Sequence, residues 1–168
     1  MITCYVQYEL NPSKIAEFEE RAIYTGFKAG GIVGLTEASA HKPLDFGSNG
    51  TEIMESISNA VLLLQKESVH KPYALIVGQK AYLALNKEVN GIPLVERIER
   101  LIGGKVIQSL VLDGAFLVPY DNENLELVVG QDFVLGYESH NTKEVTLFIT
   151  ESFLFRVLDP HLSIPFSM

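Results

Sequence analysis

The stretch from Leu125 to Pro160, LELVVGQDFVLGYESHNTKEVTLFITESFLFRVLDP, decides the fold of this chain. In its second half, apolar side chains recur mostly at every second residue: Val145, Leu147, Ile149, Phe153, Phe155 and Val157. This period places side chains on alternate faces of a β-strand. The polar residues Ser139–Thr142 separate this strand from an earlier one and predict the turn of a hairpin. Earlier elements are therefore expected to pack on one face of these strands.

A strand and a helix are predicted at the start of the chain. Residues Ile2–Leu10 alternate between apolar and polar side chains, which predicts a strand with one buried face. Asn11 and Pro12 are suited to the N-cap and the first position of a helix. Gly30-Gly31 is expected to end that helix, and Ile32–Leu35 to form a short strand.

The middle of the chain predicts an α+β unit. Asn49 is expected to cap a helix over 51–67, whose apolar stripe packs on a sheet. The apolar run 72–77 is typical of a strand covered on both faces. Further helices are expected over 79–87 and 94–102, the latter ended by Gly103-Gly104, and strands around 105–112, 115–118 and 125–129. This order predicts two lobes: residues 49–130 form one, and the two ends of the chain form the other.

Composition narrows the class of protein. The chain has 168 residues, of which 47% are hydrophobic, so it can bury a substantial core. Its formal charge of −8 argues against a nucleic-acid or anionic-membrane partner. The sequence contains no apolar run of about 18 residues and no signal-peptide pattern. We therefore predict a cytoplasmic protein.

Neither the histidines nor the cysteine predict a reactive site. The histidines fall in predicted loops or at the ends of elements, and none is spaced from another as metal ligands are: His41, His70, His140 and His161. Cys4 is the only cysteine, and its place on the apolar face of its strand favours a buried, unreactive side chain.

The acidic residues are also interpreted as non-catalytic. Glu17, Glu19 and Glu20 are taken as a solvated helix face rather than a metal cluster. Asp132 and Glu138 lie on the same side of a strand but too far apart for acid–base chemistry. We therefore predict no catalytic residue, no metal ligand and no cofactor, and conclude that the chain is not an enzyme.

Four segments carry a resemblance to a known family. They are KPYALIV (71–77), IPLVERI (92–98) with GGKVI (103–107), VVGQDFVLGYE (128–138), and LFITESF (147–153) with Asp159-Pro160. AEFE (16–19) and Gly34-Leu35, which come earlier in the chain, fit the same alignment more loosely. Together they resemble the encapsulins, which are shell proteins of bacterial and archaeal nanocompartments. Their fold is the α+β major capsid fold of tailed bacteriophages (Hong Kong 97-type).

The resemblance implies a lobe assignment. Residues 49–130 correspond to the axial lobe, whose tips surround the symmetry axes of a shell. Residues 1–48 and 131–168 correspond to two parts of the peripheral lobe, and the helix after Pro12 corresponds to the end of its spine helix. Encapsulins do no chemistry themselves. They assemble as homo-oligomers and enclose cargo enzymes, often ferritin-like or peroxidase-like.

The chain departs from that family at its N-terminus. Encapsulins usually extend much further there, with an N-terminal arm and an extended loop that ties neighbouring subunits together. In their place this chain has Met1–Lys14, which looks a little like the opening of NIPSNAP-type proteins, small ferredoxin-like α+β dimers. An unrelated capping strand fits these residues equally well. We therefore expect a nearly complete axial lobe and a truncated peripheral lobe.

Two sites follow from the resemblance. The loop matching the fivefold pore comprises Lys87, Glu88, Val89, Asn90, Gly91 and Ile92. An ordinary exposed loop between two helices is the alternative. Cargo peptides of the family dock beside the strand after Gly-Gln-Asp, which here offers Phe133, Leu135 and Tyr137. The alternative, which we favour, is that these three side chains cover a core.

Three functions are compatible with these features. The first is a self-assembling shell subunit, or a truncated relative that forms smaller oligomers. The second is a capsid-fold binding module that builds no closed shell. The third is a small dimeric α+β enzyme. Because long apolar strands with uncovered faces associate with other chains, we expect an oligomer. The resemblance to encapsulins implies a pentamer as its unit, since the axial lobe of that family meets around a fivefold axis.

Overall fold

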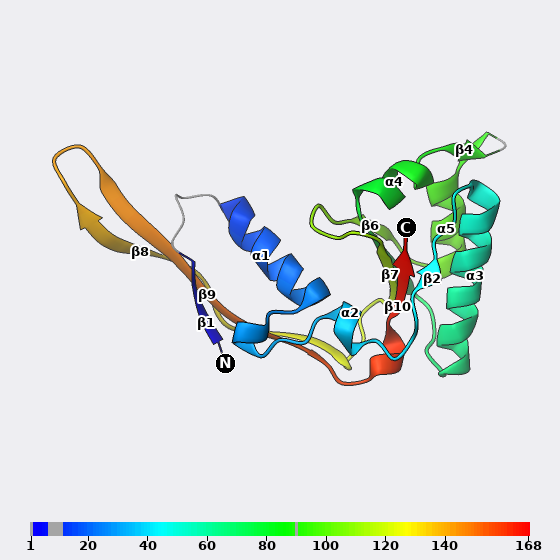
Figure 1. Cartoon of the computed structure of the whole chain (residues 1–168), viewed down its shortest axis with the longest axis horizontal. Coiled ribbons are helices and arrows are strands. Elements are labelled where there is room, and N and C mark those ends of the chain that lie inside the picture. Colours follow the sequence, from blue (N-terminus) through cyan, green and yellow to red (C-terminus); the bar gives the residue numbers. More distant parts are fainter. Residues whose placement is uncertain (1, 7–11, 90) are drawn as a thin grey trace.

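A long two-stranded ribbon and a compact lobe lie at opposite ends of the molecule (Figure 1). The computed structural model describes residues 2–6, 12–89 and 91–168. The ribbon consists of β8 (Leu125–His140) and β9 (Val145–Val157), which pair antiparallel from Leu125↔Val157 at the base to His140↔Val145 at the tip. At the turn, Asn141 Oδ1 accepts hydrogen bonds from the backbone N–H groups of Lys143 and Glu144. The predicted hairpin is confirmed, with one long strand where a strand ending at 129 was expected.

A third strand extends this sheet at the base of the ribbon. Strand β1 (Ile2–Val6) pairs antiparallel with β9, which gives the order β1-β9-β8. It confirms the first half of the strand predicted over Ile2–Leu10, whose remaining residues lie outside the described part of the chain. The predicted burial of the Cys4 side chain and the predicted cap at Asn11 also lie outside it.

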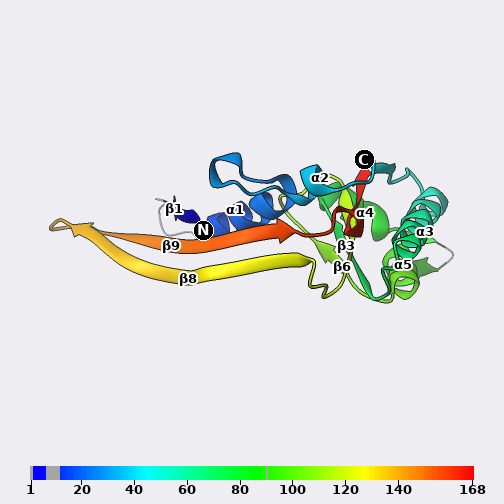
Figure 2. The same ribbon diagram turned by 90° about the horizontal axis from the view of Figure 1, so that it is seen from below.

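Helix α1 (Pro12–Thr25) lies along the base of the ribbon (Figure 2). It ends earlier than predicted, because Gly26 adopts a left-handed φ of 84° and the chain then turns back on itself. Phe27 forms a bridge with Ile32 across the short 3-10 helix η1 (Lys28–Gly30), so the predicted strand Ile32–Leu35 is reduced to one bridge. A Cβ on Gly34 would lie 2.2 Å from the nitrogen of Gly26, so this return requires glycine.

The compact lobe is built on a five-stranded sheet. Its order is β2 (Leu44–Asp45), β10 (Ile164–Ser167), β7 (Ala115–Pro119), β3 (Tyr73–Val77) and β6 (Val106–Gln108). The helices of this lobe are α3 (Gly50–Lys66), α4 (Gln79–Leu85) and α5 (Leu94–Ile102), whereas the short helix α2 (Leu35–Ala38) contacts α1. The predicted cap of α3 is confirmed, since Asn49 Oδ1 accepts hydrogen bonds from the N–H groups of Thr51 and Glu52.

The two faces of this sheet contribute to two different cores. Leu75 and Leu117 belong to a large core shared with α3, α4 and α5. The neighbouring residues Ala74 and Phe116 belong to a second core, together with residues of α1 and the base of β9. Because successive side chains of a strand point to opposite faces, β3 and β7 connect the two cores directly. The sheet is therefore covered on both faces, as the apolar run 72–77 predicted.

The end of the chain returns to the compact lobe. The sequence assigned all of 131–168 to the peripheral lobe, but Ile164 and Phe166 pair with β7 of the compact sheet. Their side chains are buried in the large core. Strand β10 follows the 3-10 helix η2 (Pro160–Leu162), and its four residues are too few to indicate a partner from sequence alone.

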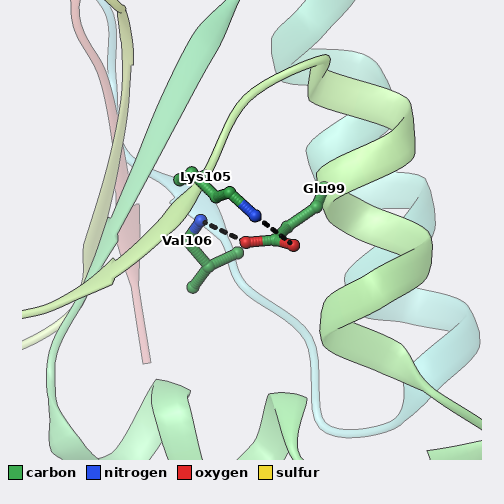
Figure 3. A network of polar contacts seen from close by, with 3 residues as sticks. All are labelled: Glu99, Lys105 and Val106. Atoms are coloured by element: carbon green, nitrogen blue, oxygen red, sulfur yellow. Dashed lines mark hydrogen bonds and ion pairs between the residues drawn. The ribbon is translucent and has the colours of Figure 1, made fainter.

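A small polar network joins α5 to the sheet (Figure 3). The Glu99 carboxylate accepts hydrogen bonds from Lys105 Nζ at 3.4 Å and from the backbone N–H of Val106 at 3.3 Å. In the sequence between Glu99 and Lys105, Gly103 ends α5 with a left-handed φ of 69°. A Cβ on Gly104 would lie 2.0 Å from the carbonyl oxygen of Tyr73. The predicted stop at Gly103-Gly104 is confirmed, and Gly104 also permits close approach to β3.

We predict that Ile98→Ala lowers the free energy of unfolding by about 2–5 kcal/mol, because it leaves a cavity in the large core. Ile98 lies on α5 with 0% of its surface exposed. The matched control is Leu110→Ala, whose side chain is 77% exposed. The control should change stability by no more than about 0.5 kcal/mol in urea unfolding. Equal losses for the two variants would contradict this packing.

Candidate functional site

The predicted pore loop forms a small hairpin between α4 and α5, far from the tip of the ribbon (Figure 1). Strand β4 (Glu88–Val89) pairs antiparallel with β5 (Ile92–Pro93). The Leu94 N–H donates a hydrogen bond to the carbonyl oxygen of Lys87 at 3.3 Å and closes the base of the hairpin. Asn90, which the sequence placed in the pore, lies outside the described residues.

The described part of this loop faces solvent. The Lys87 side chain is exposed, and Ile92 is 40% exposed. Gly91 has a left-handed φ of 78°, and no heavy atom lies within 4 Å of where its Cβ would be. A pore arises only where several chains meet at an axis. The assignment of Lys87–Ile92 to a pore therefore stays a prediction.

The three residues predicted to contact cargo lie on the ribbon and are exposed. Phe133, Leu135 and Tyr137 expose 50%, 59% and 57% of their surfaces. The interpretation that they cover a core is therefore wrong for the single chain. The pairing of β8 with β9 shifts register between Val129 and Gln131 and again between Gln131 and Val134, and the ribbon beyond this bulged segment extends past α1 (Figure 2).

These residues belong to a larger apolar surface, which we call the outer ribbon. Its members are the exposed apolar residues of β8 and β9 beyond the bulge: Phe133, Val134, Leu135, Tyr137 and Val145. Because the residues of β8 from Gln131 to His140 are exposed except for Gly136, both faces of this strand are open to solvent. A two-stranded ribbon of this kind is marginally stable in water on its own. The outer ribbon therefore has the properties of a surface that another molecule covers.

Two pairs of aromatic or histidine rings were not predicted. At the tip of the ribbon, a hydrogen bond joins the Tyr137 hydroxyl and His140 Nδ1. Near the end of the chain, the His41 ring donates from Nε2 to the carbonyl oxygen of His161 at 3.1 Å, and the two rings are 5.7 Å apart. These histidines are 120 residues apart in sequence, so only the fold could bring them together.

A buried carboxyl group lies where α1 meets the ribbon. The Glu151 side chain is 6% exposed, and its Oε2 has no hydrogen-bond partner within the described structure. The pKa of Glu151 is raised to about 7, mainly by burial, with smaller contributions from the negative charges of Glu19 and Asp132. Sequence reasoning missed this residue. The sequence does show that Glu151 is spaced by two residues from Phe153 and by four from Phe155, which places it on the same face of the strand as these apolar side chains.

The acidic residues of α1 are correspondingly less solvated than predicted. Glu17 is exposed, as expected, but Glu19 and Glu20 are half-buried. Burial raises the pKa of Glu19, with further contributions from the charges of Glu20 and Asp132. Glu20 Oε2 accepts a hydrogen bond from the buried Ser109 hydroxyl at 2.8 Å. The interpretation as a solvated face is therefore wrong for Glu19 and Glu20.

The described residues contain neither a cluster suited to a metal ion nor a helix suited to a membrane. Across 2–6, 12–89 and 91–168, no three or more His, Cys, Asp and Glu side chains are grouped so that they could hold a metal ion. None of the helices in these ranges has the length and hydrophobicity needed to cross a membrane.

Comparison with known sequences gives consistent matches over most of the chain. The sequence profile of the family described as "Encapsulating protein for peroxidase" matches residues 9–154. A type 1 encapsulin shell protein of Rhodospirillum rubrum is 37% identical over 153 residues, which are 90% of this chain and 55% of the relative. The chain spans about half the length of the curated relatives it matches.

Solved structures show the same fold. A virus-like particle from Pyrococcus furiosus is similar with a TM-score of 0.75 and 22% identity, over 92% of this chain and 64% of that chain. A structure of Gordonia phage Cozz is similar with a TM-score of 0.64 and 14% identity, over 99% of this chain and 69% of that chain. The α+β capsid fold of tailed phages, predicted from the sequence, is confirmed.

Proposed function

Because the chain belongs to the encapsulin shell-protein family, we propose that it is a structural, self-assembling subunit of an encapsulin-like shell rather than an enzyme. The observation that carries the proposal is the match to shell proteins over 90% of the chain. The outer ribbon supports it, because apolar side chains on a protruding ribbon are stabilised when a neighbouring subunit covers them. The net charge of −8 supports a shell that binds no nucleic acid, and we propose a cytoplasmic location.

Two alternatives to a closed shell are compatible with this fold, and the size of the particles in solution distinguishes them. Since the chain spans about half the length of its relatives, a smaller oligomer is the main alternative to a closed shell. A capsid-fold module that binds a partner without assembling is the second. A small dimeric enzyme is less well supported, because the curated relatives are named as shell proteins.

We further propose how the lobes are placed in the assembly. The compact lobe, over 49–130 and with β2 and β10 added to its sheet, would face the symmetry axis. The two peripheral parts, 1–43 and 131–163, would extend away from it. The β4–β5 hairpin projects from the compact lobe at the end remote from the ribbon, which supports its place at an axial opening (Figure 1).

We predict that the protein is not a stable monomer at micromolar concentration. Sedimentation velocity should give species well above the chain mass of 18.6 kDa, with the pentamer as the repeating unit. Leu135→Lys should shift the distribution toward smaller species, because it places a charge on the outer ribbon. Thr142→Lys, which adds the same charge at the turn without removing an apolar side chain, is the control. A single species at 18.6 kDa that does not depend on concentration would contradict the proposal.

The pore assignment can be tested by cross-linking. In a Cys4→Ser background, Lys87→Cys should react with a bifunctional maleimide to give a ladder ending at five subunits, because the loops converge on a fivefold axis. Lys66→Cys, at the far end of α3 from this loop, is the control and should give no such ladder. If both variants give the same ladder, or if Lys87→Cys stops at dimers, the loop does not line a fivefold pore.

We also propose a cargo surface on the ribbon. The matched family is described as encapsulating a peroxidase, which supports a peroxidase-like cargo, and the sequence resemblance adds ferritin-like enzymes. Phe133, Leu135 and Tyr137 are exposed and could accept the apolar side chains of an extended cargo peptide. The same surface could instead be covered by a neighbouring subunit, and peptide binding distinguishes the two.

Binding of a cargo-derived peptide should be weak, because one wall of the site in the family comes from an N-terminal helix that Met1–Lys14 does not resemble. We expect the double variant Phe133→Ala, Tyr137→Ala to abolish whatever binding fluorescence anisotropy detects. The control is Tyr120→Ala, an exposed tyrosine of the compact lobe. Micromolar binding that survives the double variant would exclude this surface as the cargo site.

A further inference from the structure

Helix α1 rests on the ribbon through an apolar contact that contains one buried carboxyl group. On β9, Glu151 has the same parity as Phe153 and Phe155, which pack with Ala22 of α1. The rings of Phe153 and Phe18 of α1 lie 6.4 Å apart. Because alternate residues of a strand share a face, Glu151 lies on the face that α1 covers.

The side of α1 toward the ribbon brings a second carboxyl group into the same contact. Ile15 and Ala22 are buried, and Glu19 lies between them at helical spacing. Asp132, in the irregular part of β8, contributes a third carboxyl group, and its charge acts on both glutamates. The three groups come from α1, β8 and β9, so they meet only when these elements are packed together.

Glu19 and Asp132 make the surroundings of Glu151 negative, since both charges raise its pKa. Besides Glu19, α1 contributes Glu20, which accepts its hydrogen bond from Ser109 of the compact lobe. Arg21 of α1 is at an exposed position. On β1, the residue opposite Glu151 is Cys4.

We propose that Glu151 is an acid-dependent latch: in its uncharged form it holds α1 against the ribbon, and its ionisation weakens this contact as the pH rises. A protonated carboxyl group can donate a hydrogen bond to a neighbouring carboxylate and carries no charge that burial would penalise. An ionised Glu151 would be a third negative charge in a contact that gives its Oε2 no described partner. The proposal concerns the packing of one chain and does not rest on shell formation.

The sign of the pH dependence follows from linkage. Glu151 has a pKa of about 7 in the folded protein, against a model value of 4.5. The folded state therefore binds this proton more tightly than the unfolded state. The stabilisation is fully present at pH values below the ordinary carboxyl range and is lost as the pH rises through about 7. Glu19, whose pKa is raised for a similar reason, acts in the same direction.

The test compares the wild type with Glu151→Gln, which keeps the shape of the side chain but cannot ionise. Hydrogen exchange of the α1 amides is measured at pH about 5.5 and about 8.5, and corrected for the intrinsic rate at each pH. We expect wild-type protection of α1 to fall at least about tenfold between the two conditions, and that of Glu151→Gln to change less than about threefold. Glu144→Gln, an exposed glutamate just before β9, is the control and should behave like the wild type.

Equal pH dependence in the wild type and Glu151→Gln would overturn the proposal, as would a wild type whose α1 protection does not change. If Glu151→Gln fails to fold, the carboxyl carbons of the wild type are titrated by NMR after selective labelling of glutamate with carbon-13. A resonance that titrates near pH 7 and moves to lower pH in Asp132→Asn supports the latch. Titration of every glutamate in the ordinary carboxyl range overturns it. Particle size is measured in each sample, so that a change of assembly is recorded separately.

Discussion

The packing of α1 between the ribbon and the compact sheet is the contact on which the rest of the structure depends. The Tyr24 ring stacks on Phe116 of β7 at 6.4 Å, and Phe18 meets Phe153 of β9 at the same distance. The second core, which contains Ala74 and Phe116 of the sheet and Phe153 and Phe155 of the ribbon, includes Ala22 and Tyr24 of α1. Because β3 and β7 send alternate side chains into both cores, this contact also supports the compact lobe.

The position of α1 also determines which part of the ribbon is shielded from solvent. Helix α1 covers only the base of the ribbon, and beyond the register shifts at Gln131–Val134 the side chains of β8 are exposed on both of its faces. Gly136 is an exception, because the Phe148 ring lies directly over it and covers part of one face. The fold therefore orders the ribbon at its base, whereas the apolar side chains of the outer ribbon have no cover from the described residues of this chain.

Local patterns predicted the elements well, and pairings distant in sequence poorly. The alternation in 145–157, the cap at Asn49 and the stop at Gly103-Gly104 are signals that adjacent residues contain, and the structure has each of them. The pairing of β10 with β7 and the contact between His41 and His161 depend on segments far apart in the sequence. The candidate sites came from a family resemblance, because their exposed side chains have no local pattern that separates them from an ordinary surface.

Glu151 shows a different limit of prediction from sequence. Its spacing from Phe153 and Phe155 shows which face of the strand it is on, but not that another element buries it. An acidic residue in an amphipathic strand normally faces solvent, and only the position of α1 makes this one buried. Glu20 of α1 and Glu151 of β9 differ in their hydrogen bonding. Glu20 receives a hydrogen bond from the Ser109 hydroxyl, which anchors the helix to the compact lobe. Oε2 of Glu151 receives none from the described residues, so the hold on the ribbon depends on a proton. A helix anchored at one side in this way can loosen from the ribbon while the compact lobe stays folded, because the large core contains none of these groups.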